Sequence, residues 1–370
     1  MKFTNYIRLV LVLVVGTALA AVGFAQTPTP TPKADDEIIK VDSRLVVVPV
    51  SVTDANGQPV LGLTAQDFRL TEEAKQQSIE RVGNAEVVPL EIVLLFDVSA
   101  STDAMFKFEQ ETAAKFLQDV MRPNDRASIF TIGAKPTLLQ PRDVSEKSVA
   151  AIRSIVPTKE FTSFFDTVGV AADYLRKNAA EGTRRVIVVI SDGEDTNSTR
   201  ISKAIQDGYR KIGEKINTLD NKTLYQLTVN NRNAASQQER QRVLKSLQNA
   251  DTVYYSINPA GSSFQLNKMS VFGQENMQLF ADATGGTAFL PKFQPIDTKD
   301  DYQNQNNVRA NGEVLDKIFR QLGNELRSQY LLQFYSDAEF PADRFINLDV
   351  SVPSRNNLKV RSRRGYFVKN

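Results

Sequence analysis

Two runs of consecutive apolar residues in the middle of the chain each end in an acidic residue. Residues 92–96 lead directly into Asp97, and residues 186–190 lead through Ser191 into Asp192. Runs of this length are too short for a helix and suit central strands of a parallel sheet, whose two faces are both covered. Because amphipathic helical patterns separate such runs, we predict a doubly wound, mostly parallel sheet flanked by helices. These helical patterns lie at residues 105–121, after Thr162 and at residues 277–283.

Apolar residues at every second position mark both ends of the chain. Residues 46–52 carry valine at alternate positions, and the Asn-Gly pair at residues 56–57 is a strong hairpin signal. Further short strands are expected at residues 68–70, 78–82, 330–335, 345–352 and 358–368. Neither end has enough strands to bury a core by itself, because isolated hairpins are only marginally stable in water. We therefore predict a small β domain built from residues 41–88 and 328–370, with an α/β domain at residues 89–327 inserted between them.

The segment at residues 202–250 is longer than the single helix that the predicted strand order requires. Residues 220–222 have turn composition, and residues 219–238 are rich in Asn and Gln without clear periodicity. Two interpretations are open: a mobile insertion near the sheet edge that carries Asp192, or a pair of longer surface helices. In either case we expect partner-specific contacts here, because binding segments are typically carried by rigid sheets.

Residues 1–25 have the organisation of a signal peptide. A basic start precedes an apolar stretch at residues 9–21 and a small-x-small cleavage site at residues 23–25. This stretch is shorter than the roughly 20 residues that a membrane span needs; retention as an N-terminal anchor is the alternative. Residues 26–40 form a Pro/Thr-rich linker that we expect to be extended. The prediction is a periplasmic or extracellular protein with no membrane insertion after signal cleavage.

The predicted signal peptide accounts for the net charge of the sequence. The chain has 45 basic and 43 acidic residues, and the signal peptide holds two bases, Lys2 and Arg8, and no acid. The remainder is neutral, so its overall charge does not point to nucleic acid. Lys359, Arg361 and Arg363 alternate along the last predicted strand, and we expect them to form its solvent-facing side.

The sequence contains neither histidine nor cysteine. Their absence excludes Ser-His-Asp triads, cysteine nucleophiles, the usual zinc ligands and disulfides. We expect no catalytic residue and no organic cofactor.

Oxygen-bearing side chains gather where the two central strands are predicted to end. Asp97, Ser99 and Ser101 follow the first strand in an Asp-x-Ser-x-Ser pattern, and Asp192 follows the second. The carboxyl ends of parallel strands lie at one edge of a sheet, and oxygen ligands suit hard cations such as Mg²⁺. The alternative is that Asp97, Ser99 and Ser101 only cap the following helix.

Together with Thr162 in a Thr-Ser-Phe-Phe-Asp loop, these residues resemble the metal-ion-dependent adhesion site of von Willebrand factor type A domains, which have a Rossmann-like fold. The resemblance implies that Ser99 and Ser101 ligate the ion through their hydroxyls, and that Thr162 joins them directly or according to conformational state. Asp97 and Asp192 would act largely through bound water and hydrogen bonds. The implied ion is Mg²⁺, with Mn²⁺ or Ca²⁺ as alternatives, and the implied partner is a protein that presents an Asp or Glu carboxylate.

The resemblance is closer to the secreted bacterial proteins with such a domain that are common in Acidobacteria. The shared segments are Val-x-Val-x-Val-x-Asp-x-x-Gly at residues 48–57, Gly-Leu-Thr-x-x-Asp-Phe at 62–68, Tyr-x-Leu-x-Phe-Tyr at 330–335 and Arg-x-Gly-Tyr-Phe at 363–367. Residues 160–162 depart from the relatives, which have Gly-Gly-Thr where this chain has Glu-Phe-Thr.

These observations predict an exported, adhesion-type module that captures a partner carboxylate through a divalent cation. A metal-independent structural or envelope-assembly protein is the first alternative. A metal-dependent phosphoryl-transfer enzyme is the second, but the Asp-x-Asp of haloacid-dehalogenase sites is here Asp97-x-Ser99. The sequence determines neither the partner nor the oligomeric state.

Overall fold

The computed structural model describes residues 44–99, 103–158, 160–259, 268–296 and 298–368, and the side chains of all of these except residues 103–105. The predicted signal peptide and linker lie outside the described residues, as does Ser101. Within these ranges, no helix combines the length and the apolar character needed to cross a membrane.

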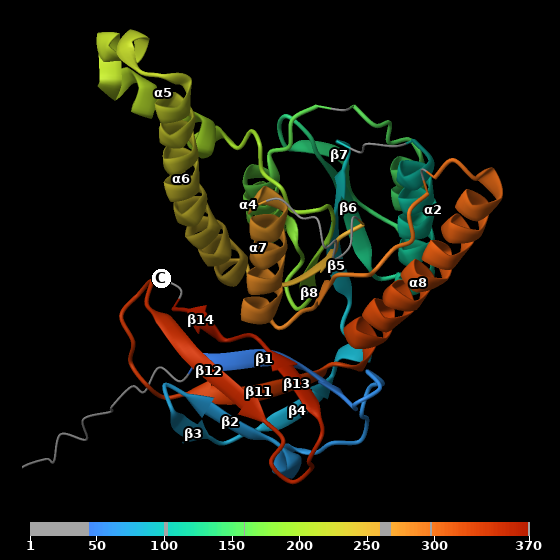
Figure 1. Ribbon diagram of the computed structural model, residues 1–370. Coiled ribbons are helices and arrows are strands. Elements are labelled where there is room, and N and C mark those ends of the chain that lie inside the picture. Colours follow the sequence, from blue (N-terminus) through green and yellow to red (C-terminus); the bar gives the residue numbers. More distant parts are fainter. Residues whose placement is uncertain (1–43, 100–102, 159, 260–267, 297, 369–370) are drawn as a thin grey trace, which may run out of the picture. The chain divides into compact units, whose positions relative to one another are not determined.

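A six-stranded sheet forms the centre of the α/β part, in the order β10-β9-β8-β5-β6-β7 (Figure 1). Its strands are β5 (Leu90–Asp97), β6 (Arg126–Ile132), β7 (Thr137–Asp143), β8 (Arg184–Ile190), β9 (Thr252–Ile257) and β10 (Ala288–Phe289). All neighbouring pairs are parallel except β6 and β7. The predicted doubly wound, mostly parallel sheet is therefore confirmed. Because β5 and β8 are parallel neighbours, the loops after both strands lie at the same edge.

Helices cover both faces of this sheet. Along β5, Ile92, Leu94 and Phe96 pack on one face, and Val93 and Leu95 pack on the other. The first face is covered by α2 (Asp103–Val120), α3 (Ser145–Arg153) and α8 (Asp301–Ser328), and the second by α4 (Phe164–Asn178), α5 (Thr199–Ile212), α6 (Asn221–Asn249) and α7 (Lys268–Thr284). Burial on both faces explains why successive residues of the central strand are apolar.

The long segment at residues 202–250 forms helices. After α5, a 3-10 helix, η3 (Gly213–Thr218), leads into α6, and Figure 1 shows α5 and α6 side by side. The side chain of Asp220 accepts a hydrogen bond of 2.7 Å from the N–H of Thr223 and so caps α6. Of the two interpretations of this segment, the helix pair is the one found.

Two antiparallel sheets combine strands from both ends of the chain, in the orders β13-β1-β11-β4 and β14-β12-β2-β3. The strands are β1 (Arg44–Thr53), β2 (Arg69–Glu72), β3 (Lys75–Gln77), β4 (Arg81–Asn84), β11 (Tyr330–Ser336), β12 (Phe345–Ser351), β13 (Lys359–Ser362) and β14 (Gly365–Phe367). The alternate valines of β1 are buried in the shared core beside Leu332 and Phe334. The prediction of β structure built from both chain ends is thus confirmed.

We expected Lys359, Arg361 and Arg363 to form the solvent-facing side of the last strand. For Arg361 and Arg363 this prediction was wrong, because most of each side chain is covered. The Arg361 side chain is 19% exposed and lies 3.6 Å from the carboxylate of Glu325 in α8. The Arg363 side chain is 13% exposed and pairs with Asp251, which precedes β9. These arginines meet acidic groups of the α/β part, and charged side chains are buried when they are paired in this way. Lys359 is exposed.

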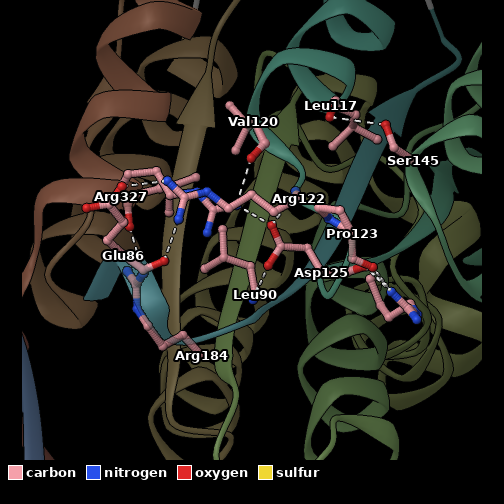
Figure 2. A network of polar contacts seen from close by, with 12 residues as sticks. Glu86, Leu90, Leu117, Val120, Arg122, Pro123, Asp125, Ser145, Arg184 and Arg327 are labelled. Carbon is pink, nitrogen blue, oxygen red and sulfur yellow. Dashed lines mark hydrogen bonds and ion pairs between the residues drawn. The ribbon is translucent and has the colours of Figure 1, made fainter. Parts of the chain in front are cut away.

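Polar contacts join the places where the chain enters and leaves the α/β part (Figure 2). Asp125, before β6, accepts a hydrogen bond of 2.7 Å from the N–H of Leu90, the first residue of β5, and pairs with Arg327 near the end of α8. Arg184, the first residue of β8, donates a hydrogen bond of 2.6 Å to the carbonyl of Leu326. A guanidinium is favourable there, because the last carbonyls of a helix lack partners within the helix.

Candidate metal centre

The side chain of Asp97 accepts three hydrogen bonds at the end of β5. Ser99 donates its hydroxyl (2.6 Å) and its N–H (3.0 Å) to Oδ1, and Ser191 donates its hydroxyl to Oδ2 (2.6 Å). Both carboxylate oxygens are thus occupied by donors. Because the two hydroxyls give their protons to Asp97, their oxygens can act only as acceptors toward other partners.

Ser191 is a residue of the centre that sequence reasoning did not select. It is buried, and its Oγ also accepts the N–H of Gly193 at 3.0 Å. Its hydroxyl therefore joins the loops that follow β5 and β8. The available signal was its position at the end of a buried strand, directly before the predicted Asp192.

Asp192 is held by its own loop and by a close approach to α7. Its Oδ1 accepts the N–H of Glu194 at 2.9 Å, and Gly193 has a φ of 77°, a region that favours glycine. A Cβ on Gly273 of α7 would lie 2.7 Å from the carbonyl carbon of Gly193 and 2.9 Å from the carbonyl oxygen of Asp192. Glycine at position 273 is what allows α7 to approach the Asp192 backbone.

Thr162 lies buried in the loop before α4, and hydrogen bonds from its backbone N–H and carbonyl connect it to the loop that follows β8. Its N–H donates to Oγ1 of Thr196 at 2.8 Å, and its carbonyl accepts the N–H groups of Thr196 and Asn197, both at 2.9 Å. The structure thus brings the loop of Thr162 to the loop that contains Asp192. Phe161, which stands where the relatives have the second glycine of Gly-Gly-Thr, is 69% exposed.

Two further aspartates, one in the loop after β8 and one in the first turn of α4, cap helices. Asp195 Oδ2 accepts the N–H of Phe165 at the start of α4 (2.9 Å), and Asp166 Oδ2 accepts the N–H of Thr199 at the start of α5 (2.8 Å). Each cap satisfies an N–H group that the helix leaves without a partner. Asp166, which lies in the first turn of α4, therefore fixes the beginning of α5.

A buried carboxyl group on α2, that of Glu109, interacts electrostatically with the two site aspartates. Burial raises the pKa of Glu109 to about 8, and the negative charges of Asp97 and Asp192 add to the shift. Burial also raises the pKa of Asp97, and it raises the pKa of Asp192 to about 6. Sequence reasoning missed Glu109, because nothing in a helical pattern shows that one polar residue faces a site formed by distant loops.

The donor set fits a divalent cation. Within the described residues, Asp97, Glu109, Asp192 and Glu194 take part in no ion pair. No group of three or more acidic side chains in those same residues is arranged to hold a metal by itself. If an ion binds here, the hydroxyl oxygens around Asp97 would be its main ligands, and the carboxylates would position these hydroxyls and offset its charge.

A family model for the von Willebrand factor type A domain matches residues 92–194, the part of the chain that contains the predicted metal residues. A search of curated proteins found no match.

Several solved structures are distantly similar to the chain. BatB from Bacteroides thetaiotaomicron is 11% identical with a TM-score of 0.36, over 65% of this chain and 100% of that chain. An aerotolerance-related membrane protein from Bacteroides fragilis is 14% identical with a TM-score of 0.33, over 60% and 99%. Proximal thread matrix protein 1 from the mussel byssus, solved with a zinc-occupied MIDAS motif, is 12% identical with a TM-score of 0.38, over 69% and 50%. The family match, not these distant likenesses, identifies the domain.

Proposed function

We propose that this protein, which contains a von Willebrand factor type A domain, is an exported module that binds another protein through a divalent cation, with Mg²⁺ as the first candidate. The hydroxyls of Ser99, Ser101 and Thr162 would hold the ion, supported by Asp97 and Asp192. The partner would contribute an Asp or Glu carboxylate. The signal-peptide pattern of the sequence supports a periplasmic or extracellular location.

The hydrogen bonds of Asp97 carry this proposal. Ser99 donates its hydroxyl proton to Asp97 at 2.6 Å, so the lone pairs of its oxygen would be free to bind a cation. The neighbouring carboxyl groups of Glu109 and Asp192 have raised pKa values and, within the described residues, no basic partner. A bound cation would offset this mutual repulsion.

A divalent cation at this position supplies a Lewis-acidic centre that attracts a carboxylate. The chain's own residues position the groups around it: Ser191 holds Asp97, Gly273 admits the backbone of Asp192, and Thr196 holds the loop of Thr162. Hydroxyl ligands are neutral, so the ion would retain most of its charge for the partner. We assign no catalytic step to these residues.

A metal-independent structural or envelope-assembly protein is a second candidate, and one observation favours it. Asp97 already accepts three hydrogen bonds, from Ser99 and Ser191, so these loops are held together by protein groups alone.

Isothermal calorimetry with Mg²⁺ and Mn²⁺ separates the two candidates. The proposal expects one saturable site in the purified protein and an affinity at least about tenfold lower in Asp192→Asn. Asp173→Asn is the matched control, since its side chain on α4 is 55% exposed; it should bind as the wild type does. Absence of saturable binding to the wild type would leave the structural candidate.

A further inference from the structure

The helix pair formed by α5 and α6 has an excess of positive charge. Residues 199–234 contain seven basic and three acidic residues, although the chain after the predicted signal peptide is neutral overall. Two of the acids are engaged within the pair: Asp207 lies 3.1 Å from Arg210, and Asp220 caps α6. Basic groups therefore dominate the exposed surface of the pair, whereas the neighbouring metal centre is acidic.

Four exposed basic residues lie along one side of α5, and we call them the α5 stripe: Arg200, Lys203, Arg210 and Lys211. At 3.6 residues per turn, Lys203 and Arg210 fall on the side opposite Ile201 and Ile205, which pack toward the core. Arg200 and Lys211 lie at one flank of that side. The Arg200 and Arg210 side chains are 68% and 78% exposed. Lys203 and Lys211 form no ion pair with any described residue. Lys203 and Lys211 are therefore available to an acidic partner, whereas Arg200 and Arg210 remain exposed but already pair with Glu239 and Asp207.

The base of the helix pair is fixed to the first turn of α4, the helix that follows the loop of Thr162. The N–H of Thr199 donates to Asp166 at 2.8 Å, and Arg242 of α6 lies 2.7 Å from Glu239 and 4.0 Å from Asp166. Glu239 is buried and also lies 3.5 Å from Arg200. These contacts orient α5, whose 14 residues extend about 21 Å from the loop that contains Asp192.

We propose that the α5 stripe and the metal centre form one docking surface for an acidic segment of a partner protein. One Asp or Glu of that segment would bind the cation, and further acidic residues would pair with the α5 stripe. This inference rests on the proposed metal-dependent function. Charge complementarity supports it, since a basic stripe beside a site for a carboxylate attracts acidic segments and fixes their direction along the helix.

Fluorescence anisotropy with a labelled peptide of ten glutamates, in the presence of Mg²⁺, tests the proposal. The double variant Lys203→Glu with Arg210→Glu should bind about three- to tenfold more weakly at low salt, because each exposed ion pair contributes only modestly. The difference should shrink as the salt concentration rises. Lys115→Glu with Lys147→Glu is the matched control, with the same change of net charge on helices α2 and α3 of the other sheet face. It should bind within twofold of the wild type.

The outcomes separate the docking surface from the metal-dependent function. If chelation with EDTA releases the peptide but the α5 double variant binds as the control does, the α5 stripe is overturned and the metal site stands. If the peptide stays bound in EDTA while the double variant still binds weakly, the metal-dependent function fails. If a DNA oligonucleotide of equal charge binds as tightly as the peptide in EDTA, the stripe is a general polyanion surface and the assigned partner class is wrong.

Discussion

The hydroxyl of Ser191 donates a hydrogen bond of 2.6 Å to Oδ2 of Asp97, and this bond joins the ends of two neighbouring parallel strands. Asp97 is thereby bound both to its own loop, through Ser99, and to the loop that contains Asp192. Since the bond connects the two halves of the candidate site, Ser191 should influence metal binding without being a predicted ligand.

Ser191→Ala removes this connection. We expect Mg²⁺ affinity to fall about tenfold, as is typical when a group that orients metal ligands is lost. The stability of the fold should fall by about 1–3 kcal/mol, because a buried carboxylate loses a donor. Calorimetric titration and urea unfolding measure the two effects. Ser128→Ala, a buried hydroxyl on β6 whose bond to Tyr174 is 3.4 Å, is the control and should leave Mg²⁺ affinity unchanged.

Glu109→Gln should change how stability depends on pH in the metal-free protein. The folded chain keeps the Glu109 proton up to a pKa of about 8, whereas the usual value is 4.5. Between pH 4.5 and pH 8 the unfolded chain binds fewer protons at Glu109 than the folded chain does. The free energy of unfolding of the wild type therefore falls as pH rises, by at most about 1.4 kcal/mol per pH unit.

Glu109→Gln has no titrating group at this position and lacks this penalty. The melting temperature of Glu109→Gln relative to that of the wild type should therefore rise from pH 5 to pH 8 and stay constant above pH 8. Glu111→Gln, on the same helix but 49% exposed, is the control. If the difference in melting temperature between Glu109→Gln and the wild type is the same from pH 5 to pH 8, the prediction is contradicted.

Gly273→Ala should weaken both the fold and the metal site. A methyl group there would lie within 3 Å of backbone atoms of Asp192 and Gly193, so the loop or α7 must move. We expect lower thermal stability and a several-fold loss of Mg²⁺ affinity. Gly169→Ala in α4 is the control, because its Cβ would meet only the flexible guanidinium of Arg242, at 3.4 Å. An Ala at 169 should keep affinity and could add up to about 1 kcal/mol of helix propensity.

Arg327→Ala should destabilise the α/β part strongly. Asp125 is 1% exposed, and losing Arg327 would leave its buried charge without a basic partner, at a cost of about 3–5 kcal/mol (Figure 2). Arg122→Ala breaks the nearby, exposed pair with Glu86 and should cost much less stability, because exposed ion pairs contribute little. Similar unfolding midpoints for the two variants in guanidinium chloride would show that the buried pair does not hold this junction together.

The sequence alone predicted the parallel sheet and the placement of Asp97 and Asp192 after neighbouring strands, because buried strands require apolar runs and parallel strands end at one edge. It also predicted that both chain ends share β structure, from the valine alternation of β1 and the shortage of strands at each end. It left open whether residues 202–250 are helices, because an Asn- and Gln-rich segment lacks the apolar periodicity that marks a helix.

The tertiary structure decided the contacts that depend on residues far apart in the sequence. Ser191 reaches Asp97 across 94 positions, and Gly273 meets the backbone of Asp192 from another helix. Glu109 becomes part of the acidic centre because α2 packs beside the strand ends, and Arg361 is only partly exposed because α8 supplies Glu325. A local pattern records only the period of burial along an element, whereas these contacts depend on which elements the fold places against one another.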